Sequence, residues 1–217
     1  MRSLLRAVVC GALLAMAAGC NIAGLFGYAA GGSMKVPAEY KLENRPTVVL
    51  VENYENADLY ALPADRLERG ITDDLTEGKL AKLIAPDKVN DVKSSDPTDY
   101  HKMDIPALGR AVGAKQVVYV NLVQFTVDSP AGGDRFVGKA EVHVKVVDSD
   151  TGHTLWPPDS SNGRVLKYET KTTDEVDATK FDRVEDQLCQ NLTQKISRLF
   201  REITVEEQEN EQAAMSR

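Results

Sequence analysis

Apolar and polar positions alternate almost without exception over residues 138–147. The apolar face carries Ala140, Val142, Val144 and Val146, and the polar face carries Glu141, His143 and Lys145. Successive side chains of a strand point to opposite faces of a sheet, so this period of two predicts a strand. One face is expected to pack on a core and the other to meet water, as in an antiparallel sheet.

Other apolar runs predict the remaining strands. Residues 47–51 are continuously apolar and β-branched apart from Thr47 and Leu50, which is typical of a strand buried on both faces. Residues 116–127 predict a long strand. Shorter strands are predicted at 82–86, 153–156 and 165–172. We expect 82–86 to lie at an edge, because Pro86 has no N–H to donate to a neighbouring strand.

Three segments carry the three- and four-residue apolar spacing of amphipathic helices. The stripes are Leu67, Ile71 and Leu75; Ile105, Leu108 and Val112; and Phe181, Val184, Leu188, Leu192, Ile196, Leu199 and Ile203. Residues 87–103 are polar and unpatterned, which predicts a loop with room for one turn of helix.

The order β-α-β-α-β-β-β-α indicates an α/β (α+β) fold, with a mixed sheet of about five strands, a strand meander and helices packed on the sheet. The predicted division is a signal peptide at 1–19, a tether at 20–45, one domain at 46–204 and a flexible tail at 205–217.

The N-terminal segment has the layout of an export signal. Arg2 and Arg6 precede a charge-free apolar run at 7–18, which is too short to cross a bilayer as a helix. The sequence Ala17-Ala18-Gly19-Cys20 resembles the lipobox of bacterial lipoproteins. The resemblance implies cleavage before Cys20 and acylation, including palmitate, on that residue. An ordinary secretory signal, which needs no cysteine, is the alternative.

Charge and cysteine content narrow the function classes. The formal net charge of −7 argues against nucleic acid or an anionic lipid surface as partner. With Cys10 in the signal and Cys20 lipidated, Cys189 is left as a single thiol, expected to be partly buried and inert; intermolecular pairing is the alternative. Asn21, rather than aspartate, follows Cys20, which by analogy with enterobacteria favours the outer membrane.

Two short motifs carry a resemblance to envelope lipoproteins. In 108–120 a helix ends at Gly113-Ala114 and leads into an apolar strand; Gly113 is suited to a left-handed cap. In 144–156 a strand ends at Asp148, followed by Thr151-Gly152 and a second strand. The Asp148 carboxylate is expected to accept backbone N–H bonds while Gly152 takes a positive φ.

Both motifs occur in this order in lipoproteins similar to the curli-secretion channel subunit and to the activators of penicillin-binding proteins. The resemblance implies an α/β domain associated with assembly or activation. The chain departs from both families, since the connections 128–139 and 157–164 are short and polar where the curli-type pore needs long hairpins. The tether also lacks the long disordered reach of the activators.

Candidate sites are few. The sequence has no nucleophile elbow, no phosphate-binding glycine loop and no metal-spaced Cys or His pair, so we predict no enzyme, no metal and no cofactor. Candidate partner-binding residues are Tyr100 and His101 in the polar segment, and Trp156, because tryptophan is enriched at binding hot spots. The alternatives are solvated histidines and a tryptophan that covers the core at a strand end.

These features predict a non-enzymatic lipoprotein of the cell envelope and periplasm, anchored through lipid on Cys20, whose domain binds an envelope protein or assembles with itself. A subunit of a secretion or export complex is the alternative of the same class. A small-ligand receptor or enzyme is the alternative of another class, and a deep pocket with converging polar groups would favour it.

Overall fold

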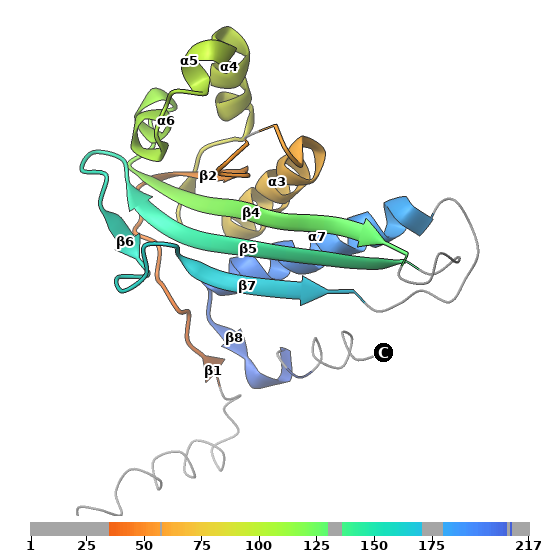
Figure 1. The fold of residues 1–217 in the computed structure, drawn as a ribbon. Coiled ribbons are helices and arrows are strands. Elements are labelled where there is room, and N and C mark those ends of the chain that lie inside the picture. Colours follow the sequence, from red (N-terminus) through yellow and green to blue (C-terminus); the bar gives the residue numbers. More distant parts are fainter. Residues whose placement is uncertain (1–34, 57, 130–135, 171–179, 208, 210–217) are drawn as a thin grey trace, which may run out of the picture. The chain divides into compact units, whose positions relative to one another are not determined.

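A mixed sheet forms the centre of the fold (Figure 1). The computed structural model describes residues 35–56, 58–129, 136–170, 180–207 and 209. Among these, residues 38–201 form one compact unit with a six-stranded sheet. Its strands are β2 (Pro46–Glu52), β3 (Lys82–Leu83), β4 (Gln116–Asp128), β5 (Val137–Asp148), β6 (Thr154–Trp156) and β7 (Arg164–Glu169).

Strand order confirms the predicted fold class and corrects one detail. Strands β3, β2 and β4 are parallel neighbours, with β3 at the predicted edge, and β4 pairs antiparallel with β5. The predicted meander is wrong, because β7 does not pair with β6. Strand β6 takes only Val146 and Val147 at the end of β5, which leaves Lys139–Val144 free to pair with β7.

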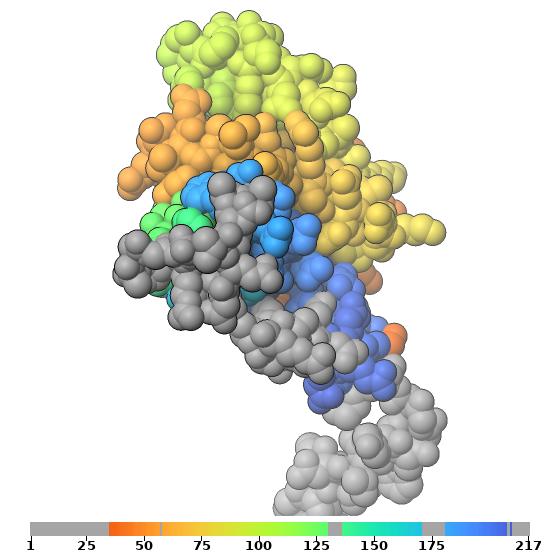
Figure 2. All heavy atoms as spheres, turned by 90° about the vertical axis from the view of Figure 1, so that its right-hand side faces the viewer, coloured from red at the N-terminus to blue at the C-terminus, as the bar shows by residue number. Residues whose placement is uncertain are grey.

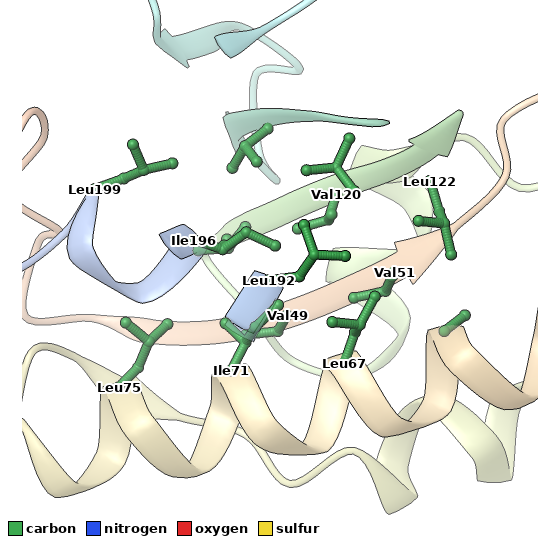
Figure 3. Packing of buried hydrophobic residues seen from close by; sticks show 14 of the residues in the cluster. Val49, Val51, Leu67, Ile71, Leu75, Val120, Leu122, Leu192, Ile196 and Leu199 are labelled. Carbon is green, nitrogen blue, oxygen red and sulfur yellow. The ribbon is translucent and has the colours of Figure 1, made fainter. Parts of the chain in front are cut away.

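Two helices cover one face of this sheet. Helices α3 (Ala61–Glu77) and α7 (Lys180–Arg198) follow the predicted apolar stripes. Leu67, Ile71 and Leu75 of α3 face the valines of β2, and Leu192 and Ile196 of α7 complete the layer (Figure 3). The buried alternate residues of β5 belong to the same cluster, which confirms the face expected to pack on a core. In Figure 2 the orange-to-yellow surface of α3 adjoins the blue surface of α7.

Three short helices lie on the other face, where they cover only the part of the sheet formed by β2 and β4. They are α4 (Asp87–Ser95), α5 (Pro97–Tyr100) and α6 (Ile105–Ala111). The predicted loop over 87–103 is therefore wrong. Helices α4 and α5 form with few buried apolar residues: Val89 alone is buried in α4. Helix α5 begins after Asp96, whose carboxylate accepts the Asp99 N–H at 2.9 Å.

The two turns that carry the family resemblance have the expected geometry. Gly113 has φ 80° and Gly152 has φ 74°. The Asp148 carboxylate accepts the backbone N–H groups of Asp150 at 3.0 Å and Thr151 at 2.8 Å, and Arg45 Nη1 donates to its second oxygen at 2.8 Å. These donors hold the pKa of Asp148 well below its usual range, with the Thr151 N–H contributing most.

We expect Asp148→Ala to lower the free energy of unfolding by about 1–2 kcal/mol, because two turn N–H groups and Arg45 lose their acceptor. Asp148→Asn is the matched control: its amide oxygen still accepts the turn N–H groups, so it should lose less. Urea unfolding of both variants measures the difference. Equal losses would contradict a role for the turn bonds.

Residues 38–45, which the sequence pattern assigns to the tether, belong to the compact unit. Tyr40 donates its N–H to the Leu199 carbonyl at 2.9 Å, and Leu42 is buried in the main cluster. A separate small unit contains β1 (Lys35–Val36) paired antiparallel with β8 (Ile203–Thr204). The terminal helix thus ends at Arg198, before Ile203, because Ile203 extends into this strand pair. Residues 1–34, including Cys20, lie outside the described residues.

Candidate functional site

A cleft of about 820 Å³ lies on the face that carries α4–α6. Three segments line it: the end of β2 with the loop after it (52–56), the connection from α5 into α6 (100–108), and the β5–β6 hairpin. The predicted candidates Tyr100 and His101 both line this cleft. Their ring centroids are 5.7 Å apart in an edge-on arrangement. The structure therefore brings together two of the three predicted partner-binding residues.

Glu52 is a half-buried acid of the cleft. It follows the buried run of β2 and accepts a hydrogen bond from the Tyr100 hydroxyl at 2.8 Å. Burial raises the pKa of Glu52, and the Tyr100 hydroxyl and the Lys93 ammonium partly offset this by stabilising the carboxylate. Burial, followed by the negative charge of Glu52, also raises the pKa of Tyr100. The pair therefore holds one carboxylate oxygen in a fixed position.

A tyrosine and a lysine stand beside Glu52 on the same face of the sheet. Strand register places Leu50, Tyr119 and Lys145 in one row across β2, β4 and β5. The Lys145 ammonium lies 5.1 Å from the centroid of the Tyr119 ring, a cation–π contact. Burial lowers the pKa of Lys145. Leu50 and Lys145 both line the cleft, so this row forms part of its floor.

A smaller hollow of about 320 Å³ lies between α3 and the helices α4 and α5. Tyr100 and His101 line it as well, so they separate the two spaces. Lys93, also in this lining, places its ammonium 5.5 Å from the Tyr100 ring centroid. Two aromatic rings on this face, those of Tyr100 and Tyr119, are thus each covered by a lysine.

Trp156 lies elsewhere, on the opposite face of the sheet. Its side chain is only 7% exposed and packs with Phe200 and Tyr40, each with a ring centroid 6.0 Å away. This position agrees with the alternative reading, a tryptophan that covers the core at a strand end. Such a side chain offers little surface to a partner, and its predicted role in binding stays a prediction.

The remaining histidines and the thiol of Cys189 are not gathered at the cleft. His143 lies on the polar face of β5 with Nε2 3.1 Å from a Glu141 carboxylate oxygen, and His153 is in the turn before β6. The Cys189 thiol is free and buried, and burial raises its pKa to about 12, as expected for an inert thiol. Within the described ranges, no three His, Cys, Asp or Glu side chains are placed to hold a metal ion.

The described helices include none with the length and apolar character needed to cross a membrane.

Sequence reasoning missed Glu52, Tyr119 and Lys145. Glu52 is the acidic end of an otherwise buried strand, and Lys145 belongs to the polar face of β5. Glu52 and Lys145 each had a signal, yet only the pairing of β4 with β2 on one side and with β5 on the other brings them to one place with Tyr119.

Tyr100→Phe should raise the pKa of Glu52 further, because the carboxylate loses a donor that favours its charged form. A carboxyl-carbon NMR titration measures this pKa directly. Tyr54→Phe is the matched control, since Tyr54 also lines the cleft but is 72% exposed. A Glu52 pKa unchanged in the Tyr100 variant would show that the hydroxyl does not stabilise the carboxylate.

No family model matches the sequence, and neither does any curated protein. Among solved structures, the lipoprotein GNA1162 from Neisseria meningitidis has a TM-score of 0.44 at 12% identity, over 70% of this chain and 99% of that chain. The hypothetical protein CT253 from Chlamydia trachomatis has a TM-score of 0.44 at 16% identity, over 71% and 94%. The PelC L103M dodecamer from Paraburkholderia phytofirmans has a TM-score of 0.43 at 16% identity, over 77% and 96%. TM-scores below 0.5 at these identities carry no argument about function.

Proposed function

We propose that this protein is a bacterial envelope lipoprotein, anchored through lipid on Cys20, whose α/β domain binds another protein. The observation that carries the anchor is the sequence at 7–20: a charge-free apolar run that ends in small residues directly before a cysteine. Several acyl chains, each contributing roughly 0.8 kcal/mol per buried CH₂, hold a protein on a membrane durably. The outer membrane is the proposed location, because asparagine (Asn21) and not aspartate follows the cysteine.

Surface composition around the cleft supports a protein partner. The loop after β2 and the start of α3 expose three large apolar side chains: Tyr54 at 72%, Leu62 at 71% and Leu59 at 42%. Tyr54 also lines the cleft with Tyr100 and His101. Exposed apolar and aromatic side chains beside a concave, polar-lined surface are typical of interaction sites. The proposed contact surface for the partner therefore consists of the cleft and this loop.

Membership of a secretion or export complex is a narrower form of the same proposal. It is supported by the Gly113-Ala114 and Asp148–Gly152 motifs, whose turn geometry matches the resemblance to curli-type and activator lipoproteins. Assembly with further copies of the chain would satisfy this form of the proposal too.

A small-ligand receptor is the second candidate, and one observation favours it. The cleft of about 820 Å³ has the half-buried Glu52 carboxylate and the Lys145 ammonium in its lining, and its volume is within the size range of small-molecule sites. An acid and an ammonium that are both fixed would orient a polar ligand without any covalent chemistry.

Photo-crosslinking in living cells tests the protein-binding role. A photoreactive amino acid at Tyr54 or His101 should capture one defined envelope protein or a second copy of this chain, identified by mass spectrometry. The matched control places it at Asp73, an exposed residue of α3 that lines neither hollow. Capture of nothing at the cleft positions, or of the same products at all three, would contradict the proposal.

A further inference from the structure

Lys145 differs from the other two lysines of β5–β7 that share its face of the sheet. Lys139 lies 3.6 Å from a Glu169 carboxylate oxygen, and Lys167 lies 2.7 Å from one of Glu141. In the part of the chain that the structure describes, Lys145 forms no ion pair within 4.0 Å. Its ammonium lies over the face of the Tyr119 ring. A partly buried ammonium without a carboxylate has given up hydration without a compensating ion pair.

The acids that share the cleft with Lys145 do not supply that partner. The Glu52 carboxylate is bound by the Tyr100 hydroxyl. The Asp104 carboxylate accepts the Ala107 N–H at 2.7 Å at the start of α6. Glu55 is exposed at the rim. The cleft lining holds two lysines, of which Lys102 is exposed and Lys145 is half-buried; of the three acids beside them, Glu52 and Asp104 already accept hydrogen bonds.

Apolar side chains line the cleft together with Lys145. Leu50, Leu108 and Val147 are buried residues of the cleft lining, and Met103 and Ile105 are half-buried beside them. A carboxylate entering here is shielded from bulk water, which strengthens its attraction to the ammonium. The same surroundings favour a ligand whose carboxylate lies next to an apolar group.

We propose that this cleft receives an acidic side chain of a protein partner, whose carboxylate pairs with Lys145 while a neighbouring apolar side chain packs against the half-buried Met103 and Ile105. This inference rests on the proposed protein-binding function and names its chemistry. Charge-assisted hydrogen bonds are stronger than neutral ones, so the carboxylate determines which segment of the partner binds.

The test uses two dipeptide probes on the full chain in detergent micelles. N-acetyl-leucyl-glutamate N-methylamide carries the proposed groups, and its glutamine analogue has the same shape without the charge. Lysine-selective ¹⁵N NMR follows each titration. The glutamate probe should bind at least about tenfold more tightly than the glutamine probe, and the Lys145 signal should shift.

Variants of one strand separate the cleft from general charge effects. Lys145→Gln should abolish the preference for glutamate, and Lys145→Arg should retain it. Lys139→Gln is the matched control, because it removes the same charge from the same face of β5 outside the cleft lining. Should Lys145→Gln fail to fold, Lys145→Arg and the two probes on the native chain still decide the question.

Equal binding of both probes, no binding of either, or an unchanged preference in Lys145→Gln overturns the inference. The outcome of the crosslinking experiment does not depend on these results. Probe binding without a captured protein would leave the carboxylate site in place and remove the protein partner. A captured protein without probe selectivity would do the reverse.

Discussion

Cys20→Ser is expected to abolish acylation completely. The thiol is the proposed acceptor of the first lipid group, and the hydroxyl of serine is a much poorer nucleophile at neutral pH. Cells fed radiolabelled palmitate should incorporate label into the native chain and none into the variant. Intact-mass analysis should find the native chain beginning at Cys20 and the variant still carrying residues 1–19.

The other two cysteines provide matched controls. Cys10→Ser lies in the segment expected to be removed, and Cys189→Ser changes a buried thiol of α7. Both should be labelled like the native chain. Label that persists in Cys20→Ser, or that disappears in Cys189→Ser, would mean that the lipid is attached elsewhere and that the proposed envelope anchor is wrong.

Glu68→Gln is expected to stabilise the protein above pH 7. Glu68 is a buried residue of α3, 2% exposed, whose carboxylate accepts the Val51 N–H at 3.3 Å. Burial raises its pKa to about 7; the positive charge of Lys93 and the Val51 N–H oppose this, while the charges of Asp65 and Glu52 add to it. A glutamine keeps an oxygen for the Val51 N–H and removes the buried charge.

The direction of the pH effect follows from proton binding. Between pH 4.5, the ordinary value, and about 7, the unfolded chain has released a proton that folded Glu68 still holds. Stability therefore falls as the pH rises through this window, and the full penalty is present above the folded pKa. At 1.36 kcal/mol per pKa unit, the penalty is on the order of 3 kcal/mol.

Urea unfolding at pH 5 and pH 8 measures this effect. The difference in free energy of unfolding between Glu68→Gln and the native chain should be small at pH 5 and clearly positive at pH 8. Asp74→Asn is the control, because Asp74 is a half-buried acid of the same helix whose charge is not among those that act on Glu68. An equal effect of Glu68→Gln at both pH values would show that the carboxylate does not titrate in this range.

The spacing of apolar residues predicted those helices and strands that pack one face on the core along their whole length. The alternation in β5 and the stripes of α3 and α7 were sufficient because each element packs one continuous face on the main core. The Asp148 turn was predictable for a different reason: its bonds join residues only two and three positions apart.

The segment 87–103 could not be predicted in the same way. Helix α4 buries Val89 alone and α5 buries Tyr100 alone, so neither repeats an apolar position often enough to show a period. Their helical structure depends on local bonds and on the sheet beneath them. The partnership of Tyr100 with Glu52 joins residues 48 positions apart, and no local pattern encodes it.

The helical cover of the outer face stops part-way across the sheet. The buried apolar cluster beneath α4–α6 takes its strand residues from β2 and β4, whereas β5 contributes Lys145 and Val147 to the cleft beside it. The shape of such a cleft can change through insertions or substitutions in residues 100–108, while α3, α7 and the valines of the sheet that they pack on stay unchanged. Chains with the same core would then differ in the partner they bind through changes in one connecting segment, with little loss of folding stability.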